Sequence, residues 1–133
     1  MTVSDDQLIQ KARSAQGHAY APYSQFAVGA ALLTEDGQVF TGCNVENSTF
    51  GATVCAERTA VVSAVCNGAR QFVKMAIVSD NKEPVMPCGI CRSVLFEFAP
   101  NLEIISVGSS GTIERLSLSQ LYPKGFRFEA ETE

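Results

Sequence analysis

The sequence contains no tryptophan, a single histidine and no cluster of basic residues. One histidine, His18, excludes every metal site that needs two imidazole ligands. Ten basic residues against 14 acidic ones give a net charge of −4, which argues against binding to a nucleic acid polymer. No apolar run approaches the length of a membrane span, and the acidic N-terminal stretch lacks the apolar core of a secretory signal. We therefore expect a cytoplasmic protein without membrane or nucleic acid partners.

Apolar residues, by contrast, are plentiful. Of 133 residues, 46% are hydrophobic and 18% charged, which is typical of a globular chain. A chain of this length can bury about two-thirds of its unfolded surface in one core. We expect a single domain over residues 1–133, with a loose acidic tail after about residue 128.

Hydrophobic periodicity and end signals predict three helices and five strands. The helices are expected over 4–17, 55–68 and 88–100, and the strands over 26–34, 38–46, 72–80, 102–108 and 112–118, with one short turn over 119–122. A strand, a helix and a further strand favour parallel pairing in the middle of a sheet, with a hairpin at one edge. The predicted class is therefore α/β, with a mixed five-stranded sheet covered by helices on both faces in three α/β/α layers.

Two segments with cysteines carry the clearest chemical signal. Cys55 opens one predicted helix, and Cys88 and Cys91 lie on one side of the first turn of another. Three thiolates suit Zn²⁺ and leave a fourth position for water, and helix N-termini favour the thiolate form. We therefore predict one zinc ion, held by these three residues.

Three further residues adjoin the predicted ligands. Glu57, two residues after Cys55, is well placed to move a proton to or from a metal-bound water. Arg58 and Arg92 each directly follow a ligand segment and are hypothesised to offset the charge of three thiolates.

Alternatives remain open on these residues alone. A lone C-x-x-C is as compatible with a redox or structural zinc role, and Cys43 or Cys66 could close a structural site. Cys66 lies three turns along the helix from Cys55, about 16 Å away. We expect Cys66 and Cys43 to be core thiols.

Together, the motifs resemble the small, three-cysteine, zinc-dependent cytidine deaminases. The resemblance covers roughly residues 12–126 and rests on AYAPYSQFAVGAALLTEDGQVFTGCNVENSTFG, CAERTA, PCGICR and QLYPKGF, in that order. It implies that Cys55, Cys88 and Cys91 bind zinc. It also implies that zinc-activated water attacks C4 of cytidine or 2′-deoxycytidine while Glu57 shuttles protons, giving uridine or 2′-deoxyuridine and ammonia in pyrimidine salvage.

The resemblance also implies a set of substrate contacts. Asn44 and Glu46 match a pair that binds the ribose hydroxyls, although by themselves they read as solvated residues at a strand end. Phe26 matches an aromatic that lines the base pocket, and backbone groups at Ala56 and Pro87 are expected to contact the base edge. Phe126 matches an aromatic that stacks on the base in a neighbouring subunit, which implies a homotetramer. A core position is the alternative for both aromatics.

Two positions depart from the family pattern. Ser93 stands where the family usually has glutamine, and Ile90 where it commonly has a small residue. The missing glutamine would remove a hydrogen-bond partner near the arginines, so zinc tuning and substrate range are the properties in question. The competing functions are deamination of another aminopyrimidine nucleoside or antibiotic, and a zinc-stabilised binding module without chemistry.

Overall fold

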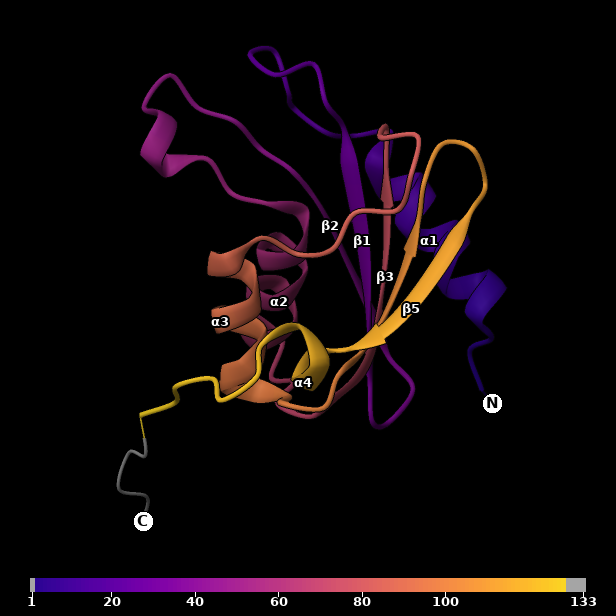
Figure 1. The fold of residues 1–133 in the computed structure, drawn as a ribbon, viewed down its shortest axis with the longest axis vertical. Helices are drawn as coiled ribbons and strands as arrows, with labels where there is room; N and C mark the ends of the chain where they lie inside the picture. Colours follow the sequence, from indigo (N-terminus) through magenta and orange to yellow (C-terminus); the bar gives the residue numbers. More distant parts are fainter. Residues whose placement is uncertain (1, 129–133) are drawn as a thin grey trace.

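The computed structural model describes residues 2–128 of the chain. The elements are α1 (Asp5–Gln16), β1 (Val28–Thr34), β2 (Val39–Cys43), the 3-10 helix η1 (Phe50–Ala52), α2 (Ala56–Cys66), β3 (Phe72–Ser79), α3 (Gly89–Phe98), β4 (Glu103–Val107), β5 (Ile113–Ser117) and α4 (Leu118–Leu121). Figure 1 shows α1 on one side of the sheet and α2, α3 and α4 on the other. The predicted three-layer α/β/α class is confirmed.

The five strands form one mixed sheet in the order β2-β1-β3-β4-β5. The pair β3–β4 is parallel, as predicted, and the other three pairs are antiparallel. The sheet has a hairpin at both edges, not at one edge as expected. The second hairpin, β4–β5, turns at Gly111, whose φ of 90° is accessible to glycine at little steric cost.

Helix α1 covers one face of the sheet. Ser4 caps it through a reciprocal capping box with Gln7, which satisfies two backbone N–H groups at its start. Its buried stripe packs on strand residues that include Ala31, Ala76 and Ile105. The helix lies so close to β1 that a Cβ on Gly29 would stand 2.0 Å from the Ala12 carbonyl oxygen.

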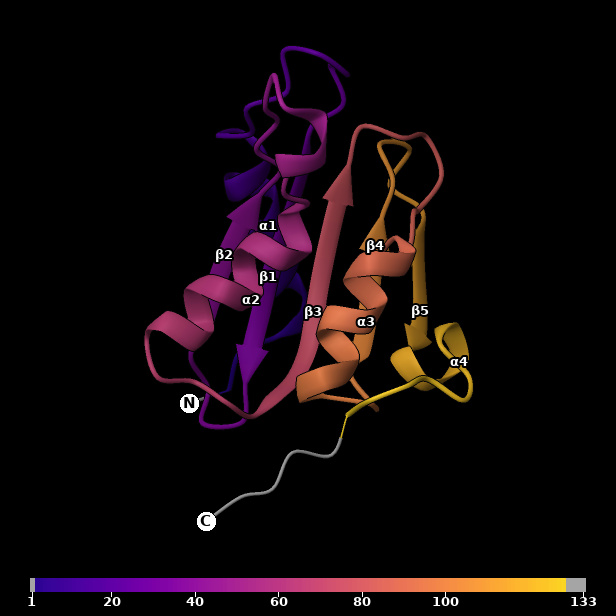
Figure 2. The same ribbon diagram turned by 90° about the vertical axis from the view of Figure 1, so that its left-hand side faces the viewer.

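Helices α2 and α3 lie side by side on the opposite face (Figure 2). Their apolar residues share a core with the sheet, which includes Ala60, Val61, Leu95 and Ile77. Cys55 and Cys88 occupy the N-cap positions of the two helices. The fold therefore brings two cysteine-bearing helix starts, 33 residues apart in sequence, to one place.

The remaining differences concern element ends. The β1–β2 strands are shorter than predicted, so Phe26, Asn44 and Glu46 lie in the flanking segments, and η1 was not predicted. No described helix has the length and hydropathy required to cross a membrane. The expected loose tail lies outside the described residues.

Candidate active site

Three cysteine side chains converge at the starts of α2 and α3. The sulfur atoms of Cys55, Cys88 and Cys91 all lie within 4.8 Å of one another, and the Cys55 and Cys88 sulfurs are 3.9 Å apart. Cys91 is buried, Cys55 is half-buried and Cys88 is exposed. The cluster is therefore open to solvent on the Cys88 side.

The spacing of the sulfurs fits a tetrahedral zinc ion. Two thiolates bound at about 2.3 Å in tetrahedral geometry stand about 3.8 Å apart, close to the 3.9 Å that separates Cys55 and Cys88. Among the described residues, no other cluster of three or more cysteine, histidine or acidic side chains is close enough to hold a metal ion. Three ligands leave a tetrahedral ion one further position, which is the arrangement of a catalytic and not of a closed structural site.

The charges of the cluster point to a cation as well. A hydrogen bond from the Cys91 thiol, and also the Arg58 guanidinium, lower the pKa of Cys55 to about 5 against the opposing effect of burial. The neighbouring Cys55 and burial raise the pKa of Cys91 far above its ordinary value. One thiolate thus opposes ionisation of the next, and a divalent cation would remove that opposition.

Arg58 is the arginine that contacts the cluster. Its Nη2 lies 3.3 Å from the Cys55 sulfur and 3.4 Å from the Thr53 carbonyl oxygen. Its Nε is buried and has no hydrogen-bond partner within residues 2–128. Arg92, in contrast, donates to the carbonyl oxygens of Pro87 at 2.7 Å and Leu121 at 2.9 Å. Arg58 therefore has the geometry expected of a charge-compensating residue. Arg92 instead joins α3 to the residue before its N-cap and to the end of α4.

Glu57 lies in the first turn of α2 and its side chain faces inward. The residue is only 7% exposed. Burial, with a smaller contribution from the charge of Cys55, raises the pKa of its carboxyl group to about 7. A carboxyl group with a pKa near neutrality can both accept and release a proton under physiological conditions.

Asn44 and Glu46 are buried and are not the solvated residues that their polarity suggested, with exposed fractions of 8% and 9%. The Asn44 amide donates to Phe26 O at 2.8 Å and accepts from Val28 N at 2.9 Å. The Glu46 carboxylate accepts from the backbone N–H of Tyr23 at 3.0 Å and of Ser24 at 3.1 Å, and from the Ser24 hydroxyl. Both side chains therefore hold the segment that leads into β1.

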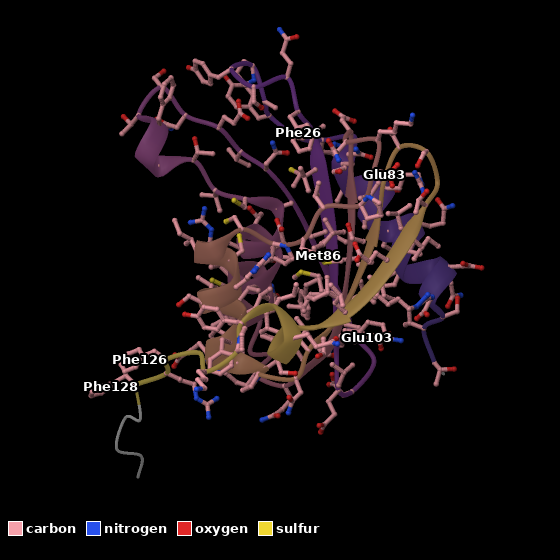
Figure 3. The ribbon with its side chains drawn as sticks, viewed as in Figure 1. Phe26, Glu83, Met86, Glu103, Phe126 and Phe128 are labelled. Carbon is pink, nitrogen blue, oxygen red and sulfur yellow. The ribbon has the colours of Figure 1, made fainter. Side chains whose placement is uncertain are left out.

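The two predicted aromatic contacts lie in different parts of the molecule. Phe26 is half-buried just before β1, whereas Phe126 is 76% exposed. Figure 3 shows Phe126 beside Phe128 at the lower left of the molecule, whereas Phe26 lies near the top. The exposure of Phe126 shows that it is not part of this chain's own core.

The other two cysteines and the two positions that depart from the family pattern are not part of the cysteine cluster. Cys66 is exposed at the end of α2, so the expectation of a core thiol was wrong. The buried residues of α2 are Ala56, Glu57, Ala60, Val61 and Ala64, and residue 66 falls outside that stripe. Cys43 is half-buried, and burial raises the pKa of its thiol. Ile90 is 63% exposed and Ser93 is also exposed.

Sequence reasoning missed two residues that hold the segment before β1. Ser24 donates to Glu46, and its oxygen accepts from Phe26 N at 3.1 Å. Asp80, which follows β3, accepts from Ala27 N at 2.9 Å. A polar residue directly after a buried strand is the signal that could have drawn attention to Asp80, but its partner lies 53 residues away.

Comparisons with known proteins cover both cysteine segments. Residues 2–107 match the sequence profile described as the cytidine and deoxycytidylate deaminase zinc-binding region. The cytidine deaminase of Sporosarcina psychrophila is 45% identical over 125 residues, which span 93% of this chain and 92% of that protein.

Solved structures agree with these sequence matches. The crystal structure of cytidine deaminase from Burkholderia pseudomallei aligns with a TM-score of 0.90 at 45% identity, over 92% of this chain and 99% of that one. The cytidine deaminase of Mycobacterium tuberculosis aligns with a TM-score of 0.82 at 39% identity, over 94% and 99% of the two chains.

Proposed function

Because this chain belongs to the cytidine and deoxycytidylate deaminase family, we propose that it hydrolyses cytidine and 2′-deoxycytidine to uridine and 2′-deoxyuridine with release of ammonia. One observation carries the proposal. A buried carboxyl group, that of Glu57, lies in the first turn of the helix whose N-cap is Cys55, one of the three clustered cysteines. This pairing of a metal site with a proton carrier is what hydrolytic deamination needs.

The metal site in this proposal consists of Cys55, Cys88 and Cys91. Zinc bound there would lower the pKa of a water molecule to about 7. Arg58 donates to the Cys55 sulfur, and its positive charge would offset part of the negative charge of three thiolates.

Glu57 performs the proton transfers. Its carboxylate accepts a proton from the attacking water as oxygen adds to C4 of the pyrimidine, and passes a proton to N3. The carboxylate then takes the remaining proton from the hydroxyl group formed at C4 and delivers it to the exocyclic nitrogen. The C4–N bond breaks, ammonia leaves and the C4–O bond becomes the carbonyl of uridine. The pKa of about 7 caused mainly by burial matches this alternating role.

Phe26, Asn44 and Glu46 form the nucleoside side of the proposed pocket. Asn44 and Glu46 are both held in place by bonds to the backbone around Phe26. A carboxylate has about four lone-pair sites, so Glu46 retains capacity to accept from a ribose hydroxyl. We assign recognition of the edge of the pyrimidine base to backbone groups at Ala56 and Pro87. The Pro87 carbonyl oxygen also accepts a hydrogen bond from Arg92.

We further propose that the active protein is a homotetramer with shared sites. Phe126 is 76% exposed and lies away from Phe26 of its own chain in Figure 3, so it is available to a neighbour. Stacked on the base in a neighbouring subunit, it would complete a pocket that one chain of 133 residues leaves open. The proposed setting is pyrimidine salvage in the cytoplasm.

A direct assay tests the reaction. The zinc-loaded protein is incubated with cytidine or 2′-deoxycytidine, and loss of the cytosine absorbance is followed. Turnover of either nucleoside supports the proposal, and its absence would refute it. Turnover confined to another aminopyrimidine nucleoside would favour the alternative substrate class. No turnover with any member of such a panel would favour a binding module.

A further inference from the structure

The segment from Tyr23 to Val28 is fastened to the body of the protein from two sides. Asn44 and Glu46 hold it from the end of β2, as described above. On the other side lie Asp80, directly after β3, and Gln16, the last residue of α1. We propose that Asp80, aided by Gln16, is a positioning residue that fixes Phe26 for nucleoside binding, an inference that rests on the function proposed above.

Asp80 continues the β1–β3 pairing by one residue, with its side chain taking the place of a backbone acceptor. The last strand pair is Val28 with Ser79, and Ala27 and Asp80 come next. Asp80 N donates to Ala27 O at 3.2 Å. In return, Ala27 N donates to the Asp80 carboxylate at 2.9 Å. Both backbone groups of the residue after Phe26 are therefore bound by one residue.

Gln16 ties the same point to α1. Its side-chain nitrogen lies 3.1 Å from Ala27 O and 3.1 Å from the second carboxylate oxygen of Asp80. The two oxygens of Asp80 thus have separate donors. Asparagine has the same shape but only one acceptor oxygen, so it could accept from only one of these two donors.

The bonds from both sides meet at three consecutive residues. Asn44 accepts from Val28 N and donates to Phe26 O, while Asp80 binds both backbone groups of Ala27. The residue before Phe26 is Gln25, whose φ of 56° is rarely adopted by residues other than glycine. We infer that this backbone keeps its shape because it is bound on either side, and that it relaxes when one side is released.

Release on the Asp80 side would move Phe26 without touching Glu57 or the thiols. Phe26 contacts the base equally in the bound and reacting states under this proposal. Loss of its position therefore raises KM and leaves kcat nearly unchanged. A general loss of folded structure would instead lower the content of active enzyme and its zinc.

The test compares Asp80→Ala, Asp80→Asn and Gln16→Ala in the full-length, zinc-loaded protein. Asp6→Ala and Gln10→Ala, at exposed positions of α1, are the matched controls. We expect KM for cytidine to rise roughly tenfold in Asp80→Ala, with kcat within about twofold and zinc retained. Asp80→Asn and Gln16→Ala should show smaller rises, and the controls none.

Hydrogen exchange without substrate gives a second readout. Amides of residues 24–28 should exchange roughly tenfold faster in Asp80→Ala, while those of α2 stay protected. Unchanged exchange of 24–28, or a fall in kcat at constant KM, would overturn the proposal. If Asp80→Ala folds poorly, Gln16→Ala carries the same test because it leaves the carboxylate in place. If residues 24–28 exchange faster in Asp80→Ala but the wild type turns over neither cytidine nor 2′-deoxycytidine, the proposed function is refuted. The role of Asp80 in holding this segment is then still supported.

Discussion

At the scale of single residues, burial sets the pKa of Glu57. A carboxyl group that water reaches freely would have an ordinary pKa and would stay ionised at neutral pH. Burial raises the pKa of Glu57 to about 7, so both protonation states are accessible. Glu57→Gln keeps the shape of the side chain and removes the proposed proton carrier.

We expect Glu57→Gln to keep its zinc and to lose activity by about 10²–10⁴-fold. Steady-state assays and metal analysis measure the two properties. Glu35→Gln, an exposed position in the β1–β2 turn, is the control and should match the wild type. Near-normal turnover in Glu57→Gln would remove the shuttle assignment.

The positions of the cysteines divide them into proposed zinc ligands and residues without a proposed role in metal binding. We expect metal analysis to find one zinc per chain. Cys55→Ala or Cys88→Ala should lose both zinc and stability, because a metal bound there would link the starts of α2 and α3. Cys66→Ala should keep zinc, since Cys66 is exposed at the far end of α2. Release of zinc by Cys43→Ala or Cys66→Ala would indicate a closed, structural site instead.

At the scale of elements, the approach of α2 to the sheet depends on Gly42. A Cβ at this position would lie 2.4 Å from Ala60 N and 2.6 Å from Ala56 O, both on α2. Gly42→Ala should therefore push the start of α2 outward, together with Cys55 and Glu57. We expect a loss of about 1–3 kcal/mol of stability and a clear fall in kcat.

Urea unfolding and activity measure this effect. Gly51→Ala is the matched control, because a Cβ at Gly51 meets nothing within 4 Å. Equal midpoints and equal kcat for Gly42→Ala and Gly51→Ala would show that α2 can be displaced without consequence.

The start of α1 is joined to the sheet by charge. Asp5 lies 2.7 Å from Lys74 Nζ on β3 and 2.9 Å from Arg115 Nη2 on β5. The hydrogen bond from Lys74, with the charges of both cations, lowers the pKa of Asp5 below its ordinary 3.8. A carboxyl group with a depressed folded-state pKa stabilises the fold above its ordinary pKa, and this stabilisation disappears as the pH falls through the folded-state value.

We expect Asp5→Asn to lose about 0.5–1 kcal/mol of stability at neutral pH, because the pair is partly exposed and screened. The difference from the wild type should shrink as the pH falls below 3.8. Asp6→Asn, which shares the helix turn and is exposed, controls for the helix dipole. A difference independent of pH would contradict the ion-pair explanation.

At the scale of the whole molecule, the role proposed for Phe126 would connect oligomeric state to catalysis. Stacking of an aromatic ring on a base contributes about 1–3 kcal/mol. Phe126→Ala should therefore weaken kcat/KM roughly tenfold or more and leave zinc in place. Sedimentation of the wild type should give a mass near four chains. A stable, fully active monomer would exclude the shared site.

Sequence by itself determined the parts of this protein that depend on local pattern. Ser4, Gly37 and Gly68 mark the ends of elements because capping and positive φ are properties of a few neighbouring residues. The spacing of Cys88 and Cys91 likewise follows from the pitch of one helix turn. The alternation of strands and helices was sufficient for the three-layer class.

Tertiary structure alone decided which distant residues meet. The inward position of Asn44, the exposure of Cys66 and the contact of Arg58 with Cys55 depend on how α2 is rotated and where each loop returns. The bond from Asp80 to Ala27 spans 53 residues and requires the register of β1 against β3. Such contacts carry no local sequence signal, because their energy is gained only after the sheet has assembled.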